Sequence, residues 1–397
     1  MRDLIVIGAG PGGSVTAKEA AKRGLDVLLI DREDEIGSPK RCAEGLGLGT
    51  FERHDIPIKD EFKAKDIYGA RIYAPNGNDV EARSEEVNGF VLERKIFDKY
   101  LAKMAAEEGA EVRAGVEATD LEQTEEDTVK VDLQSRSDEW TEEAKIVVGA
   151  DGVDSLVARW TGVDSSVPTE DFDAGYQYEM ANIDIEDPDM IHLYFGDETA
   201  PRGYAWIFPK GENRANVGIG IGGDKPKNAK YYLDKFIEEE GIDGSILEVN
   251  VGGIPVGGIV DNLVVDNVAL VGDAARQVNP IHGGGMDEAF KAGELAGKKV
   301  AKAVNNDDLS LLEEYDEEWR ERHGSRLEKI LEVRRAAEKL DDDDINVIFD
   351  TVKEEDYDRE DLLKVAEGDY KPLFKTLMKN PNLLMRKNIM KTLKDAL

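Results

Sequence analysis

The chain has 397 residues, and 51 Lys and Arg against 85 Asp and Glu give it a formal net charge of −34. The length predicts two or three domains, and the acidity disfavours nucleic acid as a partner because a negative surface repels phosphates. The single cysteine excludes an intramolecular disulfide or a cluster held by several thiolates, and the four scattered histidines disfavour a zinc site.

No apolar run reaches the roughly 18 residues of a membrane-spanning helix. The N-terminus enters a strand directly, without the charged and apolar regions of a signal peptide, so we expect a cytoplasmic protein. The acidity also opposes docking on an anionic lipid surface in dilute buffer. At about 1 M salt the Debye length falls to roughly 3 Å and this repulsion largely disappears. A salt-adapted protein and an acidic surface kept for solubility both fit the charge.

The first predicted element is a strand, Leu4 to Gly8, that runs into a glycine-rich turn and a helix. Gly8 permits the tight turn, Gly10 lets the backbone approach a pyrophosphate, and Gly13 lets the helix pack closely on the strand. A second strand ends at Asp31, whose carboxylate can accept hydrogen bonds from ribose hydroxyls. The pattern predicts a dinucleotide site.

Two later segments, Ile146 to Arg159 and Asn267 to Phe290, share one sequence pattern. Each predicts a buried strand followed by a small-residue turn that carries an aspartate, Asp151 in the first and Asp273 in the second. The second turn continues through a run of glycines into a helix from Met286, whose amides can stabilise negative charge on a reduced flavin ring. Asp273 can then bond a ribityl hydroxyl. The three segments together favour FAD over NAD.

The pattern predicts an α/β fold with a Rossmann-like FAD-binding domain, an antiparallel β-sheet substrate domain and a helical C-terminal segment. Alternating apolar and polar residues mark the substrate domain. The expected boundaries are residues 1–160 for the first part of the FAD-binding domain, with a substrate-domain excursion near 52–90, then 161–262 for the substrate domain, 263–304 for the closing part of the FAD-binding domain, and 305–397 for the helical region.

The C-terminal region is predicted to be helical and strongly charged. Apolar residues from Leu312 to Leu331 recur at helical spacing, which favours packing onto the rest of the protein. The acidic run Asp341 to Asp344 is expected to be an exposed helix start and lacks the ligand spacing of a calcium loop. The segment Tyr370 to Met390 carries the basic patch of this acidic chain, and a membrane-facing role, a role at the mouth of the substrate site and plain helix packing all stay open for it.

Two further motifs lie outside the three segments. Pro39 to Gly45 reads PxxCxxG, and Tyr204 to Pro209 reads YxWxFP. With the FAD segments, they resemble the geranylgeranyl reductase family of the para-hydroxybenzoate hydroxylase-like flavoproteins, in order from Met1 to about Ala303. The resemblance implies an FAD-dependent enzyme that saturates geranylgeranyl chains of archaeal membrane glycerophospholipids, with peripheral contact with the inner face of the membrane. The electron donor, NAD(P)H or a ferredoxin-like protein, is left open.

Reduction of an alkene sets the chemical requirements of the active site. An isolated trisubstituted alkene is a poor hydride acceptor, so a proton must arrive before or with the hydride that a reduced flavin supplies. Cys42 in PxxCxxG is the candidate acid, because a thiol with a pKa near 8.5 stays protonated at neutral pH. A small buried hydrophobe is the alternative interpretation of Cys42. Glu44 in the same motif is interpreted as a surface acid.

The expected contacts follow from these assignments. Side chains at alternate positions of one strand share a face, so the three aromatic residues of YxWxFP can wall a prenyl channel or form ordinary sheet core. Arg94 opens a helix at a position where related flavoproteins carry an arginine against FAD. The expected substrate contacts are Tyr204, Trp206 and Phe208, and the expected FAD contacts are Gly8, Gly10, Gly13, Asp31, Arg32, Arg41, Arg94, Asp151, Gly152, Asp273, Gly285 and Met286.

Other functions share parts of this pattern. A flavin-dependent monooxygenase or halogenase has the same FAD frame, but the halogenase motif WxWxIP differs from this chain at Tyr204 and Phe208. Within the reductases, a free prenyl diphosphate or a pigment side chain can replace the phospholipid. A non-enzymatic carrier of prenyl lipids leaves PxxCxxG unexplained.

Overall fold

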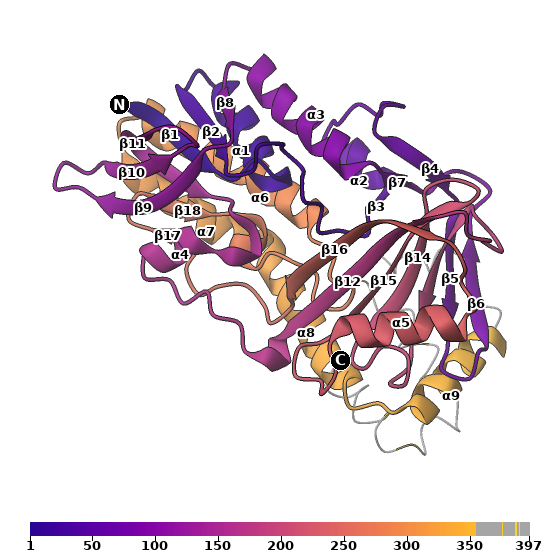
Figure 1. Ribbon diagram of the computed structural model, residues 1–397. Helices are drawn as coiled ribbons and strands as arrows, with labels where there is room; N and C mark the ends of the chain where they lie inside the picture. The colour runs from indigo at the N-terminus through magenta and orange to yellow at the C-terminus, as the bar shows by residue number, and fades with distance from the viewer. Residues whose placement is uncertain (355–374, 376–385, 387–388, 390–397) are drawn as a thin grey trace. The chain divides into compact units, whose positions relative to one another are not determined.

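The computed structural model describes residues 1–354 together with Lys375, Arg386 and Ile389. It separates into two compact units, each assembled from three stretches of the chain (Figure 1). Unit 1 comprises Met1–Lys40, Arg94–Pro168 and Ile254–Glu328, and unit 2 comprises Arg41–Glu93, Thr169–Gly253 and Lys329–Leu397. The stretch of unit 2 inserted early in the chain thus begins at Arg41, whereas the sequence pattern indicates an excursion near 52–90. The helical C-terminal region is likewise divided between the units.

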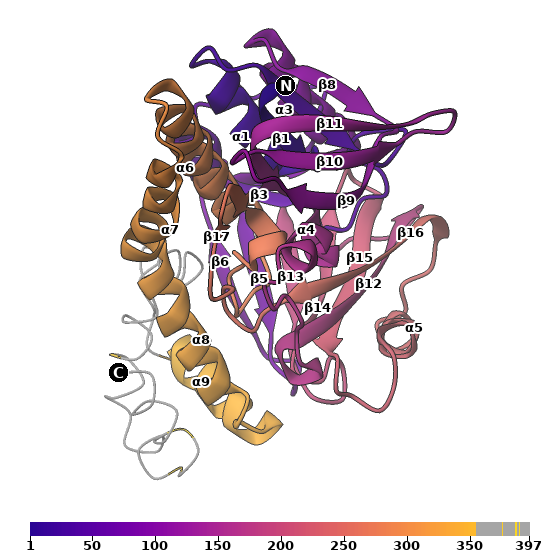
Figure 2. The same ribbon diagram turned by 90° about the vertical axis from the view of Figure 1, so that its left-hand side faces the viewer.

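Unit 1 is built on a mixed eight-stranded sheet, with strand order β17-β18-β11-β1-β2-β8 and with β10 and β9 continuing from β11. Strands β18, β11, β1, β2 and β8 run parallel, whereas β9, β10 and β11 form an antiparallel meander (Figure 2). The strands are β1 (Arg2–Ile7), β2 (Val27–Asp31), β8 (Glu111–Ala114), β9 (Glu117–Gln123), β10 (Val129–Gln134), β11 (Glu139–Gly149), β17 (Val264–Val265) and β18 (Val268–Leu270).

The parallel strands β1, β2 and β18 and the second half of β11 are mostly apolar and buried, as expected for strands covered on both faces. Leu4, Ile5 and Val6 of β1 are fully buried. Small residues let α1 and α6 approach each other closely, because a Cβ at Gly293 would lie 2.6 Å from the carbonyl oxygen of Gly12. The helices are α1 (Pro11–Ala21), α3 (Arg94–Glu107), α4 (Leu156–Trp160), α6 (Met286–Asn305) and α7 (Glu314–Trp319).

Unit 2 contains a seven-stranded sheet of order β16-β12-β15-β14-β13-β5-β6 and a small sheet of order β3-β7-β4. Helix α5 (Ala229–Glu239) packs on one face of the larger sheet, where Leu233 and Phe236 join a core of apolar side chains from β12, β14 and β15. The strands are β3 (Gly45–Gly47), β4 (Lys63–Ile67), β5 (Gly69–Tyr73), β6 (Asp79–Arg83), β7 (Gly89–Leu92), β12 (Phe172–Ala181), β13 (Met190–Tyr194), β14 (Tyr204–Pro209), β15 (Arg214–Gly222) and β16 (Ser245–Pro255).

Three further helices complete the described part: α2 (Leu48–Arg53), α8 (Ser325–Ala337) and α9 (Asp342–Glu354). The predicted apolar stripe of the C-terminal region is buried at Leu312, Tyr315 and Trp319, although a π-helical turn at Arg320–Gly324 separates α7 from α8. Helix α9 starts within the acidic run as expected, but its Asp344 is buried and pairs with Arg386 at 2.9 Å.

Among the described residues, no helix is both long and apolar enough to cross a membrane. The basic segment Tyr370 to Met390 lies outside the described residues, apart from Lys375, Arg386 and Ile389. The larger sheet of unit 2 pairs β13 with β5 in parallel, whereas β12, β15, β14 and β13 are antiparallel neighbours, as are β5 and β6. The Rossmann-like unit, this largely antiparallel sheet and the C-terminal helices confirm the fold class that the sequence predicts.

Candidate functional site

The three predicted FAD segments meet at one edge of the unit 1 sheet. Strands β18, β11 and β1 are parallel neighbours, so their carboxyl ends lie side by side. Gly8 follows β1, Asp151 follows β11, and Asp273 follows β18. In open α/β sheets, ligands bind outside the carboxyl ends of the strands. The topology therefore places three sequence-distant motifs around one potential ligand site.

The glycine-rich turn has little room for side chains at two positions. A Cβ at Gly13 would lie 1.8 Å from the carbonyl oxygen of Gly8, and Gly8 itself has a φ of +105°. Around Gly10, by contrast, a Cβ would meet nothing within 4 Å. Helix α1 begins directly after Gly10 with neither a side-chain cap nor an acidic residue in its first turn. Free amide N–H groups beside open space fit a pyrophosphate group.

Two aspartates at this edge are held by backbone amides. The Asp31 carboxylate accepts hydrogen bonds of 2.9 Å from the N–H groups of Ala9 and Glu33, and each oxygen keeps a lone pair for a ribose hydroxyl. Asp151 accepts one from the N–H of Val157 at 3.0 Å, and its other oxygen is buried without a hydrogen-bond partner. Burial raises the pKa of both carboxyls. An unpartnered buried acceptor fits a site completed by the hydroxyl of a ligand.

Asp273 faces the start of helix α6. A Cβ at Gly285 would lie 2.9 Å from the Asp273 Oδ1 atom, so glycine at this position leaves the carboxylate its space. Burial raises the pKa of Asp273, and the positive charge of Arg94 opposes that shift. Arg94 itself forms two hydrogen bonds of 2.7 Å to Asp98. This arrangement fixes Arg94 as a positive group on the Asp273 side of the sheet.

The first turn of α6 carries two acidic residues. Its first helical residue is Met286, and its first turn contains Asp287 and Glu288. Lys291 pairs with both carboxylates, at 2.6 Å and 3.0 Å, and so reduces the negative charge beside the exposed amides. Because Lys291 compensates the charges of Asp287 and Glu288, these two carboxylates repel a nearby anion only weakly. The amide N–H groups at the start of α6 can therefore still stabilise an anionic ring.

Three other predicted FAD contacts occupy different surroundings. Arg32 pairs with Asp154 at 2.7 Å, close to Gly152, which has a φ of +70°. Arg41 lies in unit 2, where a Cβ at Gly252 would be 3.2 Å from the Arg41 Cβ atom. The predicted FAD contacts of unit 1 are turn, strand-end and helix-start residues, with Arg32 directly after the end of β2, whereas Arg41 belongs to unit 2.

The YxWxFP residues lie on the face of the unit 2 sheet opposite α5. Ala205 and Ile207, which alternate with them, belong to the core beneath α5. Trp206 is buried against the backbone of β15, since a Cβ at Gly218 would lie 2.5 Å from its ring. Tyr204 and Phe208 are only partly buried. The aromatic face thus combines one packed residue with two that offer accessible apolar surface.

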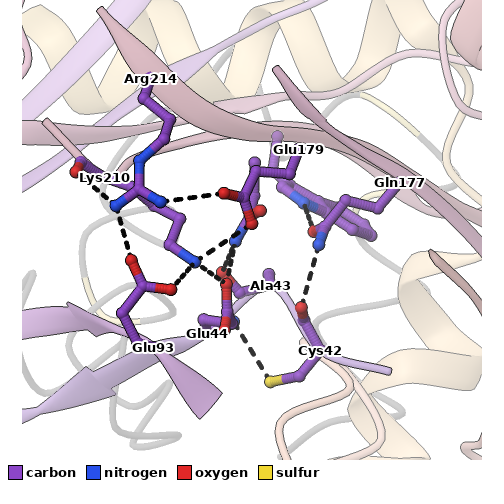
Figure 3. Close-up of polar contacts among 10 residues, drawn as sticks. Cys42, Ala43, Glu44, Glu93, Gln177, Glu179, Lys210 and Arg214 are labelled. Atoms are coloured by element: carbon purple, nitrogen blue, oxygen red, sulfur yellow. Dashed lines mark hydrogen bonds and ion pairs between the residues drawn. The ribbon is translucent and has the colours of Figure 1, made fainter. Parts of the chain in front are cut away.

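The PxxCxxG loop packs on this aromatic face. The Trp206 indole N–H donates to the Gln177 side-chain oxygen at 2.8 Å, and the Gln177 amide donates to the Cys42 carbonyl at 3.1 Å (Figure 3). A Cβ at Gly45 would lie 2.5 Å from the Phe208 ring, which accounts for glycine there. The structure thus brings the two motifs together, although more than a hundred and fifty residues separate them in sequence.

Cys42 is a free thiol with intermediate exposure. Its Sγ atom accepts a hydrogen bond of 3.2 Å from the backbone N–H of Glu44 (Figure 3). The sulfur is thereby held in one orientation while its S–H bond remains available to donate a proton. This geometry differs from that of a small hydrophobe enclosed in a core.

A buried charged cluster beside this loop was missed from the sequence, and the interpretation of Glu44 as a surface acid is wrong. Glu44 is 1% exposed, and its carboxylate accepts hydrogen bonds of 2.7 Å from both Lys210 and Asn216 (Figure 3). The Lys210 ammonium also reaches Glu93 at 2.8 Å and Glu179 at 3.3 Å. The cluster consists of Glu44, Glu93, Glu179, Lys210, Arg214 and Asn216.

Comparison with known proteins places these features in one family. Residues 171–254 match the model of the geranylgeranyl reductase catalytic domain, and residues 6–84 match that of an NAD(P)-binding Rossmann-like domain. Two similar relatives are named digeranylgeranylglycerophospholipid reductase, one of them as reductase 2. The protein from Methanosarcina acetivorans is 44% identical, covering 93% of both chains. The one from Methanococcoides burtonii is 42% identical, covering 93% of this chain and 92% of the relative.

Solved structures of other proteins share the fold of this chain. A geranylgeranyl bacteriochlorophyll reductase-like protein from Thermoplasma acidophilum superposes with a TM-score of 0.88 and 32% identity, covering 100% of this chain and 99% of that chain. A flavin-dependent brominase, with a TM-score of 0.73 and 18% identity over 96% of this chain and 98% of the other, shares the fold alone. The residues at the carboxyl edge of unit 1 fit the cofactor of such enzymes, and the chain belongs to the geranylgeranyl reductase family as an FAD-dependent oxidoreductase.

Proposed function

We propose that this enzyme saturates the double bonds of geranylgeranyl chains in archaeal membrane glycerophospholipids. The observation that carries the proposal is the 44% identity, over 93% of both chains, to a digeranylgeranylglycerophospholipid reductase. The placement of Cys42 on the aromatic face of the substrate sheet supports it, because a prenyl chain requires apolar walls and an acid.

The residues have separate tasks in this proposal. FAD, when bound and reduced, supplies the hydride. The turn residues Gly8, Gly10 and Gly13 hold the pyrophosphate, while Asp31 and Asp273 accept hydrogen bonds from sugar and ribityl hydroxyls. Tyr204 and Phe208 offer apolar surface to the alkene and exclude water. Exclusion of water matters because a carbocation-like centre would otherwise be hydrated rather than reduced.

Cys42 is the proposed proton donor. Its S–H bond delivers a proton to one alkene carbon as the hydride forms a C–H bond at the other, which leaves a thiolate on the sulfur. The backbone N–H of Glu44, 3.2 Å from Sγ, then stabilises that thiolate until a solvent proton restores the thiol. Each double bond therefore takes up one hydride and one proton.

The experiment is anaerobic. Dithionite-reduced protein is incubated with a geranylgeranylated glycerolipid, and mass spectrometry of the lipid reads the gain of hydrogen. We expect a gain of one hydride and one proton per double bond without oxygen. An oxygen requirement, together with an unchanged lipid under anoxia, would instead indicate a monooxygenase or halogenase and would refute the proposal.

A second substrate class is supported by one observation. The structure with a TM-score of 0.88 is described as geranylgeranyl bacteriochlorophyll reductase-like, so a pigment side chain is a competing acceptor. A free prenyl diphosphate is the other alternative that the sequence leaves open. Parallel assays with a geranylgeranylated pigment, with geranylgeranyl diphosphate and with the glycerolipid, at equal concentrations, discriminate between them. We expect the glycerolipid to be reduced faster.

The membrane and the electron donor complete the proposal. A substrate that resides in the bilayer favours peripheral contact of a cytoplasmic enzyme with the inner face of the membrane. The formal charge of −34 would oppose that contact at low ionic strength, so salt should strengthen binding to anionic vesicles. NAD(P)H and a reduced ferredoxin-like protein are the two candidate donors, and stopped-flow reduction of bound FAD by each distinguishes them.

A further inference from the structure

The charged cluster beside the Cys42 loop is unusual in its burial and its charge. The side chain of Lys210 is 0% exposed, and that of Glu44 is 1% exposed. The carboxylates of Glu44, Glu93 and Glu179 are linked through the Lys210 ammonium, and Arg214 also pairs with Glu93 and Glu179. Removing such charges from water is costly, and replacing them by apolar residues is often neutral or stabilising. Stability alone therefore does not account for the cluster.

The cluster ends at the backbone of the Cys42 loop. Asn216, which is fully buried, donates one amide hydrogen to the Ala43 carbonyl at 3.1 Å and another to the Glu44 carboxylate at 2.7 Å (Figure 3). The Leu92 N–H donates to the Glu44 carbonyl at 2.9 Å. Both peptide groups that follow Cys42 are thus tied to strands of unit 2.

The loop is also held in a conformation that a non-glycine residue rarely adopts. Glu44 has a φ of 74°, in the left-handed region. Such a backbone persists when the surrounding structure over-determines it, and it is found preferentially near functional sites. In this conformation the Glu44 N–H points at the Cys42 sulfur, at 3.2 Å. The cluster, the left-handed residue and the thiol therefore form one connected arrangement.

We propose that Glu44, held by Lys210 and Asn216, is a positioning residue that fixes the Cys42 thiol for proton transfer. The inference rests on the proposed function of Cys42 as proton donor, and it names the residues that would hold the Cys42 thiol in a fixed orientation. The Lys210 ammonium anchors the Glu44 carboxylate, the carboxylate and Asn216 fix the left-handed turn, and the turn directs its amide at Sγ. The alkene then meets a thiol in one orientation.

The single cysteine of the chain makes the geometry directly measurable. Alkylation by iodoacetamide reports on Cys42 alone, as a rate followed against pH in the FAD-loaded protein. We compare wild type with Glu44→Gln and Asn216→Ala. Glu44→Gln keeps the side-chain size but offers Lys210 a neutral partner, and Asn216→Ala removes both amide bonds to the loop. We expect the pH profile of alkylation to shift toward higher pH in both variants, with severalfold slower alkylation at neutral pH, because the thiolate loses the Glu44 N–H that stabilises it.

The matched control is Glu212→Gln. Glu212 lies between Lys210 and Arg214 in the sequence, but its side chain is 79% exposed and pairs with Lys65 at 2.9 Å. The substitution is chemically identical to Glu44→Gln and lies in the hairpin that carries Lys210. We expect this control to match wild type in alkylation and in lipid reduction.

Single-turnover oxidation of reduced enzyme by the glycerolipid supplies the second measurement. A misplaced acid slows the chemical step without weakening the apolar contacts of the chain. We expect the limiting rate of Glu44→Gln to fall on the order of tenfold to a hundredfold, with little change in the half-saturating lipid concentration. If Glu44→Gln does not retain FAD, Asn216→Ala provides the same test.

The outcomes separate the two proposals. If wild type reduces no prenyl lipid, the proposed function fails, while the alkylation comparison still tests whether Glu44 positions the thiol. If the variants alkylate and react like wild type, the positioning inference is overturned and the cluster is purely structural. A loss of lipid affinity at an unchanged limiting rate would also overturn it.

Discussion

The carboxyl edge of unit 1 and the Cys42 face of unit 2 are built in different ways. At the carboxyl edge, backbone geometry dominates: glycines leave space, strand ends converge, and Asp31 and Asp151 are held by amides. At the Cys42 face, side chains dominate, and the loop is held by Glu44, Lys210 and Asn216. A cofactor common to many enzymes can be held by a backbone frame, whereas a specific proton donor needs directional side-chain contacts.

Removal of Lys210 should produce the largest effect. Lys210→Met would remove the cation that Glu44, Glu93 and Glu179 share, and breaking a buried ion pair costs about 3–5 kcal/mol. The matched control is Lys65→Met, which removes a lysine from the more exposed acids Asp189 and Glu212 and should cost about 0–1 kcal/mol. Urea unfolding of both variants measures the difference. Equal losses would mean that burial of the cluster has no special energetic role.

Replacement of the thiol comes next. Cys42→Ser should preserve the fold and the bound FAD, because a hydroxyl is similar in size, but it should slow alkene reduction by about a hundredfold, since a serine hydroxyl is a much weaker acid. Single-turnover oxidation of the reduced flavin by the lipid is the measurement. A wild-type rate would return Cys42 to the role of a small packing residue.

A methyl group in the glycine-rich turn tests the backbone frame. Gly13→Ala would place a Cβ 1.8 Å from the Gly8 carbonyl oxygen, so it should destabilise unit 1 by about 1–3 kcal/mol and abolish stoichiometric FAD. Gly10→Ala has open space and a φ of −70°, so its stability should change by less than about 1 kcal/mol. We expect Gly10→Ala to lower FAD affinity nonetheless, because its methyl group enters the space proposed for the pyrophosphate. Flavin content and urea unfolding together measure both effects.

The smallest effect concerns pH. Burial raises the pKa of Asp151 above its ordinary 3.8. Because its pKa is higher in the folded than in the unfolded protein, the Asp151 carboxyl contributes fully to the free energy of unfolding at a pH below the unfolded-state pKa. This contribution is lost as the pH rises through the folded-state pKa. Asp151→Asn removes this titration and the buried negative charge, so the apoprotein should be more stable than wild type by about 1 kcal/mol at pH 7. The difference in unfolding free energy between Asp151→Asn and wild type, measured with urea, should become smaller toward acidic pH. A difference that grows toward acidic pH would contradict a raised pKa for Asp151.

The sequence alone carried the fold class and the family, because the relevant signals are local. The turn from Gly8 to Gly13 between two apolar strands can be read without a structure, since short-range sterics make glycine necessary at fixed offsets. The same holds for the alternating residues of Tyr204 to Phe208, whose shared face follows from strand geometry. The expected domain boundaries stay predictions, and so do the roles of the site residues, which the variants above test.

Other features depended on the tertiary structure. Glu44 comes from a loop near the N-terminus, whereas Lys210 and Asn216 lie 166 and 172 positions later in the β14–β15 hairpin. No local pattern indicates that a lysine after a proline is buried. The left-handed backbone at Glu44 is equally invisible, because nothing in the residue type requires it. The sequence by itself therefore determined the glycine-rich turn and the strands around it, because local steric constraints fix them. Only the packing of distant strands decided which charged side chains were removed from water, since the cost of burying a charge depends on partners that the fold brings to it.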